Sequence, residues 1–341
     1  MAIKTVWLKL TTVELLACLF YLNSCTHVYH NRQAQDSIAD NLASQIELSD
    51  TPFYPQTEHQ CGPSALATVL QSHGVDVSPE ALSSALYIPG RKGSFQVEIS
   101  AASRSYGMLA YPLKPDFSDL LTEIAAGNPV LVLQNLRFDW WPQWHYAVVI
   151  GYDIEKSELV LRSGTTKRWQ TTFANFNKTW GRADNWALVI VPAGDIPATA
   201  SASTYLKTVH DLEDTGFIHS ALAAYRSATA RWPDDANSWL TLGNMAYKAG
   251  DSADAVTALL KAAALSPENV IVWNNLAYAL QAYGCPEQAQ QALQCAYRYS
   301  PDDRNLRDSA YEISSMASQS RAVDCPQITC NQAAVQTNNR M

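Results

Sequence analysis

The sequence predicts two folded parts of different classes, an α+β domain followed by an all-α repeat domain. In the first part the expected helices come mostly before the expected strands, and the strands are mostly antiparallel, which is an α+β layout. In the second part a period of 34 residues relates Pro233, Pro267 and Pro301. Such a period is typical of stacked helical hairpins. The 341 residues and the 47% hydrophobic content suit two domains with tails.

The charge balance argues against one class of partner. The 32 acidic residues outnumber the 24 Lys and Arg residues, and the net charge is −8. Nucleic-acid-binding domains carry a basic patch or stripe, and the sequence has no basic run, so we expect no nucleic-acid partner. No pair of Cys or His residues has metal-ligand spacing. We therefore expect no bound metal ion and no cofactor.

Residues 1–25 resemble a bacterial export signal. Lys4 and Lys9 supply positive charge, and an apolar run extends from Val13 to Leu22. The segment ends in Leu-Asn-Ser-Cys25, which resembles a lipobox, in which the cysteine is lipidated and becomes the mature N-terminus. A membrane-spanning helix is the rival interpretation, but the run is shorter than the roughly 20 residues required. A plain signal peptide or an uncleaved anchor stays open as well.

Cys25 is the expected lipidation site, and its lipid is the expected link to a membrane. Thr26 follows it, rather than the aspartate associated with retention in the inner membrane. By that resemblance the expected location is the outer membrane of a bacterial envelope, facing the periplasm. Residues 26–50 are polar and are expected to form a tether.

Cys61 begins a predicted helix in the domain expected at 51–194. Gly62 and Pro63 follow it, and proline is well tolerated in the first turn of a helix. An apolar helical run continues to Leu70. A thiol at this position faces unpaired N–H groups and the positive end of the helix dipole, which favour the nucleophilic thiolate. Gln56 lies five residues upstream, where its amide could join the Cys61 N–H in stabilising an oxyanion.

The other elements of this domain follow from helix caps, apolar runs and turn residues. Ser78 and Pro79 mark the start of a second helix, as N-cap and first helical residue. Further helices are expected at 94–106, 117–126 and 173–180. Strands are expected at 51–55, 109–113, 130–134, 146–152, 159–162 and 186–191.

His145 directly precedes the apolar strand predicted at 146–152, and it is the candidate base for the thiol. Four aromatic residues lie in the seven positions before it, from Phe138 to Trp144. They are expected either to line a groove that grips an apolar peptide side chain or to cap the core. The sequence favours neither alternative.

The two motifs together resemble a known family. Gln-x4-Cys-Gly-Pro-Ser-Ala-Leu, followed by His-Tyr-Ala-Val-Val-Ile-Gly-Tyr-Asp, is similar to the bacteriocin-processing peptidases, which are papain-like cysteine peptidases that cut leader peptides after a double glycine. The resemblance covers residues 51–192. It implies a papain-like fold, with Cys61 as nucleophile, His145 as general base and Gln56 at the oxyanion.

The third catalytic position departs from this family. Relatives place an aspartate followed by proline on the strand after the histidine strand, whereas this chain has Ser163 and Gly164 there. A serine hydroxyl can accept the imidazole N–H but brings no charge to stabilise an imidazolium. Either Ser163 is a weak orienting group, or the third member is absent.

A small-residue linker at 195–204 leads into the repeats. Ala221, Ala255 and Ala289 share the 34-residue register with the prolines. The pattern resembles three tetratricopeptide repeats within 205–317, ending in a capping helix at 304–317. Asn244 and Asn275 lie where related repeats hold a peptide ligand, so they are candidate partner-binding residues. The alternative is that they bond one repeat to the next.

The polar tail at 318–341 contains Cys325 and Cys330, and the third repeat contains Cys285 and Cys295. In an oxidising envelope some of these are expected to pair and to staple the tail to the repeats. Four cysteines allow three connectivities, and the sequence does not choose among them.

The expected function is that of an envelope cysteine peptidase that hydrolyses peptide bonds through an acyl-enzyme. Its substrate would be a peptide or protein, and the repeats would recruit that substrate or a protein partner. A weakly active or non-catalytic scaffold is the alternative from another class. A different acyl transfer on the same site, such as an amidase reaction, is a third.

Overall fold

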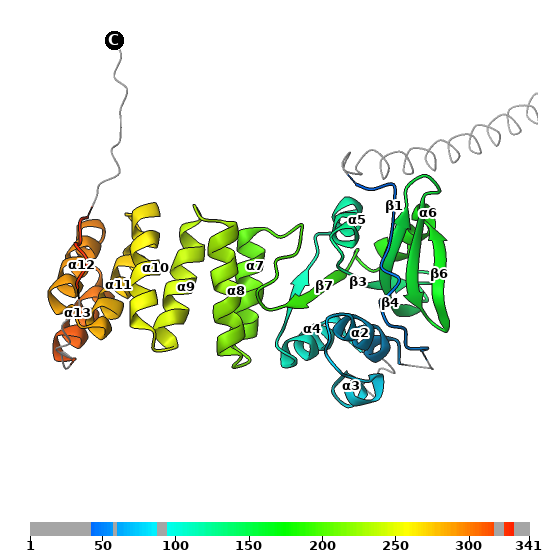
Figure 1. Cartoon of the computed structure of the whole chain (residues 1–341), viewed down its shortest axis with the longest axis horizontal. Coiled ribbons are helices and arrows are strands. Elements are labelled where there is room, and N and C mark those ends of the chain that lie inside the picture. Colours follow the sequence, from blue (N-terminus) through cyan, green and yellow to red (C-terminus); the bar gives the residue numbers. More distant parts are fainter. Residues whose placement is uncertain (1–41, 57–59, 87–93, 317–323, 331–341) are drawn as a thin grey trace, which may run out of the picture. The chain divides into compact units, whose positions relative to one another are not determined.

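A computed structural model describes residues 42–56, 60–86, 94–316 and 324–330 (Figure 1). They divide into two compact units. The first unit ends at Ile190 and lacks residues 103–111; these belong to the second unit, which continues from Val191. The expected signal segment, with Cys25, lies outside the described residues. No described helix is both long and apolar enough to cross a membrane.

The helices of the first unit come mainly from its N-terminal half. They are α2 (Cys61–Ser72), α3 (Pro79–Leu86), α4 (Gln96–Ser105), α5 (Phe117–Ala125) and α6 (Phe173–Gly181). Helix α2 is the most deeply packed, because every residue from Gly62 to Leu70 is buried. The Asp116 carboxylate caps α5, and the Thr172 hydroxyl caps α6, each by accepting a backbone N–H.

The sheet of the first unit is antiparallel, with β4 at its centre. Its strands are β1 (Gln45–Glu47), β3 (Val130–Asn135), β4 (Trp144–Asp153), β5 (Glu158–Ser163), β6 (Thr166–Thr172) and β7 (Ala187–Pro192). Strands β7, β3, β4, β5 and β6 are neighbours in that order, and β1 pairs with the far end of β4. There Gly151 is required, since a Cβ on it would lie 2.6 Å from the Ile46 carbonyl oxygen.

The start of the domain differs from the prediction. Residues 51–55 form no strand, and β1 enters the sheet earlier, inside the segment expected to be tether up to residue 50. The reason is the buried Arg162 side chain, which donates to the Ser49 carbonyl at 2.8 Å and to the Thr51 carbonyl at 3.0 Å. The Arg162 side chain therefore satisfies the Thr51 carbonyl, which the prediction assigned to a strand, and also the Ser49 carbonyl in the segment expected to be tether.

The second unit contains the helices of the repeats. They are α7 (Ala202–Glu213), α8 (Ile218–Arg231), α9 (Ala236–Lys248), α10 (Ser252–Leu265), α11 (Val270–Tyr283), α12 (Pro286–Tyr299) and α13 (Arg304–Ser315). The order confirms three helical hairpins and a capping helix (Figure 1). Strand β2 (Met108–Pro112) lies at the boundary of this unit, where the Ser201 N–H donates to the Tyr111 hydroxyl.

The same hydrogen bond recurs with the 34-residue period in two of the repeats. The Trp239 indole donates to the Pro233 carbonyl at 2.8 Å, and the Trp273 indole donates to the Pro267 carbonyl at 2.6 Å. Each proline ends one repeat, and the tryptophan six residues later bonds back to it. The alanines of the register, such as Ala255, are fully buried, which lets the paired helices approach closely.

Two disulfides join the tail to the third repeat. Cys285 pairs with Cys325, and Cys295 pairs with Cys330. Both repeat cysteines are buried, one as the N-cap of α12 and the other within that helix. The structure therefore selects one of the three connectivities that the sequence left open.

Candidate active site

Cys61 is the first residue of α2 and is partly exposed. The Ser64 N–H donates to the Gln60 carbonyl at 3.0 Å and closes the first helical turn. Gly62 is required because α2 approaches a neighbouring segment closely: a Cβ on this residue would lie 2.6 Å from Ser94 Oγ. The Cys-Gly pair is thus explained by packing, which leaves the thiol at the helix N-terminus.

Gln56 connects the ends of two strands beside this helix. Its Nε2 donates to the Tyr146 carbonyl at 3.2 Å, and its Oε1 accepts the Gly164 N–H at 3.2 Å. The Gln56 N–H also donates to the Gly164 carbonyl at 2.9 Å. These partners distinguish the oxygen of the side-chain amide from its nitrogen, so the NH₂ group lies toward β4. One of its two hydrogens remains for another acceptor.

The Cys61 thiol also lies against β4. Burial raises the pKa of Cys61, whereas the N–H groups of Tyr146, Gly62 and Cys61 itself oppose that rise by bonding to the sulfur. The net direction differs from the acidified thiolate that the helix position predicted. Desolvation outweighs the helix N-terminus, so the resting thiol keeps its proton and needs a base.

His145 is the first residue of β4 after Trp144, and its side chain is largely buried. Its Nε2 lies 2.9 Å from Ser163 Oγ. Burial lowers the pKa of His145, so the imidazole is neutral at neutral pH. Nδ1 accepts a proton in the tautomer in which Nε2 carries the hydrogen and donates it to Ser163 Oγ. Ser163, which the resemblance predicted at the position of the family's carboxylate, is thus the side chain that contacts the imidazole.

Tyr146 is a site residue that the sequence analysis did not single out. Its hydroxyl donates to the Ser94 carbonyl at 3.2 Å, and its ring packs edge-on against Trp186 with centroids 5.8 Å apart. Its backbone contacts both the thiol and Gln56. The tyrosine thus fixes the strand that carries His145 against the helix that carries Cys61. Its place directly after the histidine was the available signal.

The aromatic residues before His145 do not cap the core. Phe138, Trp140, Trp141 and Trp144 all have exposed side chains. Of the two alternatives left open by the sequence, the structure contradicts the core cap.

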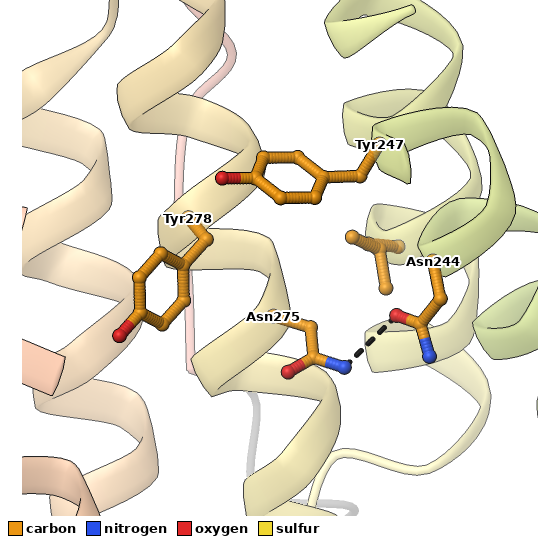
Figure 2. A pocket seen from close by; sticks show the side chains of 5 residues that line it. Asn244, Tyr247, Asn275 and Tyr278 are labelled. Atoms are coloured by element: carbon orange, nitrogen blue, oxygen red, sulfur yellow. Dashed lines mark hydrogen bonds between the residues drawn. The ribbon is translucent and has the colours of Figure 1, made fainter. Parts of the chain in front are cut away.

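Asn244 and Asn275 meet in the second unit. Asn275 Nδ2 donates to Asn244 Oδ1 at 2.9 Å, so the inter-repeat bond exists (Figure 2). The same two side chains line a cavity of about 220 Å³ together with Tyr247, Leu259 and Tyr278 (Figure 2). Among the described residues, no charged side chain lines it. Bonding between repeats and exposure to a ligand are therefore compatible at this pair.

The predicted residues thus fall into two sites. Gln56, Cys61, His145 and Ser163 converge in the first unit, and the asparagine pair lies in the second. Among the residues that the structure describes, no group of three or more His, Cys, Asp or Glu side chains could hold a metal ion.

Family comparisons agree with this division. Residues 48–188 match the Peptidase_C39 like family. Residues 206–270 and 258–291 match two tetratricopeptide-repeat families. The chain therefore has a C39-peptidase-like domain followed by tetratricopeptide repeats, as the resemblance predicted. No curated protein is significantly similar to the sequence.

Many solved structures are similar to parts of the chain, among them these three. A C39-like peptidase from Bacillus anthracis is 18% identical, with a TM-score of 0.38 over 44% of this chain and 98% of that one. The first tetratricopeptide domain of RPAP3 bound to an HSP90 peptide is 15% identical, with a TM-score of 0.32 over 33% and 90%. The MamA protein is 20% identical, with a TM-score of 0.31 over 33% and 64%.

Proposed function

We propose that the chain is a cysteine peptidase whose repeats recruit the substrate or a protein partner. The observation that carries the proposal is the convergence of four side chains from separate elements. The Cys61 thiol at the helix N-terminus and the Gln56 amide, which is held by Gly164, both contact the backbone of Tyr146 on β4. The residue before it on this strand is His145, whose imidazole is held by Ser163. This is the arrangement that acyl transfer through a thiol requires.

The reaction begins with an uncharged Cys61 thiol and an uncharged His145 imidazole. Cys61 gives its proton to His145 Nδ1 as the sulfur attacks the carbonyl carbon of the substrate. The carbonyl electrons move to the oxygen, which accepts the Cys61 N–H and the remaining Nε2 hydrogen of Gln56. When this intermediate collapses, the amine leaves with the proton from Nδ1, and a thioester remains. Water, deprotonated by Nδ1, then releases the acid and restores the thiol.

Ser163 supports these reaction steps less than a carboxylate would. For Nδ1 to act as base, Nε2 must carry the hydrogen and donate it to Ser163 Oγ, which fixes the tautomer. The imidazolium that forms in the first step has no opposite charge from this partner. The uncharged partner and the raised pKa of Cys61 are the observations that favour the alternative, a weakly active or non-catalytic scaffold.

The repeats supply a second contact for a peptide. In the asparagine pair, Asn244 Nδ2 can donate to the C=O of an extended backbone. Asn275 Oδ1 accepts Asn274 Nδ2 at 3.4 Å and has a second lone pair for a backbone N–H. Since none of the described residues that line the cavity is Lys or Arg, a neutral backbone fits better there than a terminal carboxylate. Tyr247 and Tyr278 provide apolar surface for a side chain.

We also propose that the protein is lipid-anchored through Cys25 in the outer membrane of a bacterial envelope, facing the periplasm. The two disulfides support an oxidising compartment. In cells fed radioactive palmitate, the wild type should be labelled and the Cys25→Ser variant should be neither labelled nor retained in the membrane fraction. An unlabelled wild type would exclude the lipid anchor.

The dyad is tested by alkylation and by cleavage. Cys61 is the free cysteine among the described residues, so iodoacetamide modification can be followed on its tryptic peptide. The His145→Ala variant should react at least tenfold more slowly at pH 7.5, because the raised pKa leaves little thiolate without the base. The wild type should cleave members of a peptide library that Cys61→Ala leaves intact. Equal alkylation rates together with no cleavage would favour the scaffold.

A further inference from the structure

The turn between β3 and β4, together with the first residue of β4, presents four exposed aromatic side chains. We call the side chains of Phe138, Trp140, Trp141 and Trp144 the aromatic turn; they are 58%, 78%, 62% and 54% exposed. The Phe138 and Trp140 rings stack with centroids 5.6 Å apart, and the Trp140 and Trp141 rings meet edge to face at 6.0 Å. A contiguous exposed cluster of large apolar side chains marks a binding surface.

The backbone beneath these rings is held in place. Asn135 is 1% exposed, and its Oδ1 accepts the Arg137 N–H at 3.1 Å and the Gln143 N–H at 3.0 Å. Its Nδ2 donates to the Phe138 carbonyl at 3.3 Å, and the Leu136 N–H donates to the Gln143 carbonyl at 2.9 Å. A ligand therefore does not have to order this backbone on binding, which favours affinity.

The position of the turn points to the occupant. In the β3–β4 ladder Gln134 pairs with His145, and Asn135 pairs with Trp144. The turn therefore starts one residue beyond His145 and its ladder partner. Trp141 lies four residues before His145, a distance of at most roughly 13 Å at about 3.3 Å per residue. An extended substrate covers the same distance with about four residues. The surface is thus within reach of side chains close to the scissile bond.

We propose that the aromatic turn is the specificity surface of the peptidase site, and that it takes a large apolar or aromatic side chain two to four residues from the scissile bond. This inference rests on the proposed peptidase function. Stacked indole rings contact such a side chain over a wide area. An acidic side chain would lose water there and would meet the Asp139 carboxylate, which is 83% exposed in the same turn.

The experiment compares two peptides that differ at one position. A peptide cleaved from the library is made with Phe or Ser at the candidate position, and kcat/KM is measured for both with the full-length chain. In Trp140→Ser and Trp141→Ser the preference for Phe should fall roughly tenfold or more, since burying a large apolar side chain contributes about 1.5–3 kcal/mol. The loss should come mainly from a higher KM for the Phe peptide.

Trp169 provides the matched control. It is 50% exposed on β6, outside the aromatic turn, so Trp169→Ser removes a similar area of indole elsewhere. This variant should keep the preference for Phe. A loss of preference as large as that of the turn variants would mean that exposed indoles act nonspecifically and would overturn the proposal.

Two further outcomes would also overturn it. Trp140→Ser could slow the iodoacetamide reaction of Cys61 and lower kcat/KM for both peptides equally, which would make the turn a support of the site rather than a specificity surface. Alternatively, the turn variants could lose binding to phosphatidylglycerol vesicles while keeping the preference for Phe, which would assign the surface to a membrane.

If the wild type cleaves nothing, the peptidase proposal fails by itself, and the surface is tested by binding. The full-length Cys61→Ala chain is applied to a peptide array with and without the Trp140→Ser change. Binding enriched in Phe, Trp and Leu peptides and lost in the double variant would support the surface as a peptide-recognition site. Binding that ignores the change would overturn it.

Discussion

Gly164 shows how one departure from the family fits with another residue of the site. Its backbone has a φ of 57°, in the left-handed region that favours glycine, and its N–H donates to Gln56 Oε1. The proline found here in relatives has no N–H and a φ near −65°. Glycine therefore holds the Gln56 amide by a bond that proline could not make.

Replacing this glycine should separate the two properties. Gly164→Ala keeps the N–H and strains the backbone, at a cost of about 1 kcal/mol. Gly164→Pro loses both the φ and the bond to Gln56, and peptide turnover should fall by a further tenfold or more. Turnover should be compared with the iodoacetamide rate of Cys61, which does not need an oxyanion. Equal activity of the two variants would contradict a role for this bond.

Ser163 and the buried His145 together predict the pH dependence. Because burial lowers the pKa of His145, the neutral base is already formed at pH 6.5, and activity should fall only at more acidic pH. Ser163→Asp places a carboxylate at Nε2, which stabilises the imidazolium and raises that pKa. The acid limb of kcat/KM should then move to higher pH.

The same residue can be tested for its contribution to turnover. Ser163→Ala should lose about tenfold, equivalent to about 1.4 kcal/mol, against near-complete loss for Cys61→Ala. A folded Ser163→Ala variant as inactive as Cys61→Ala would contradict the weak orienting role. A sharp rise in activity in Ser163→Asp would identify the natural chain as a weakened enzyme.

At the scale of elements, apolar patterning predicted most of the first unit. Helix α2 and strand β4 were found because an unbroken apolar run leaves few alternatives to burial. Strand β6, Thr166–Thr172, was missed because it is a polar strand with mostly exposed side chains. The early entry of β1 depends on a charged side chain 111 residues after Thr51 in sequence, and no local pattern reports such a contact.

The candidate site was predictable to a similar extent. The order of the Cys61 and His145 motifs was enough to expect their convergence, and the strand after the histidine was enough to place Ser163. Two features were not accessible. The bridge from Gln56 to Gly164 joins elements distant in sequence, and the raised pKa of Cys61 comes from burial by the whole fold.

Arg162 joins the segment before α2 to the end of β5 and the start of β6, and replacing it tests this connection. The residue is 4% exposed, and its guanidinium donates to the carbonyls of Ser49, Thr51 and Lys167. Arg162→Met should destabilise the first unit by roughly 3 kcal/mol or more, because buried carbonyls lose a charged donor. Arg162→Lys should recover only part, since lysine lacks the planar fork. Urea unfolding followed by tryptophan fluorescence measures both; a loss below about 0.5 kcal/mol would contradict this role.

At the scale of the molecule, the two units divide the work that we propose. The first unit carries the thiol and its base, and the second carries an uncharged cavity with the asparagine pair. The chain is acidic overall, which suits recruitment through specific pockets better than through a basic surface. Cleavage and recruitment can then be varied separately, by Cys61→Ala in one unit and by Asn244→Ala with Asn275→Ala in the other.

The disulfides give the whole-molecule prediction that links stability to compartment. Cys285–Cys325 and Cys295–Cys330 close loops with sequence separations of 40 and 35 residues. In the chain-entropy estimate each such loop contributes about 4 kcal/mol. Reduction of the full-length chain should therefore lower the melting temperature of the helical signal at 222 nm.

The Cys285→Ser and Cys325→Ser double variant should reproduce part of this change without a reductant, because the second bridge still holds the tail. Reductant added to that variant should then produce the rest. Titration of the unfolded, unreduced wild type should find none of the four cysteines as free thiols. A wild type that melts identically with and without reductant, or that carries four free thiols when isolated from cells, would contradict the pairing of the tail with the third repeat. The repeats would then have to be stable through helix packing alone, and the disulfides would no longer support an oxidising compartment.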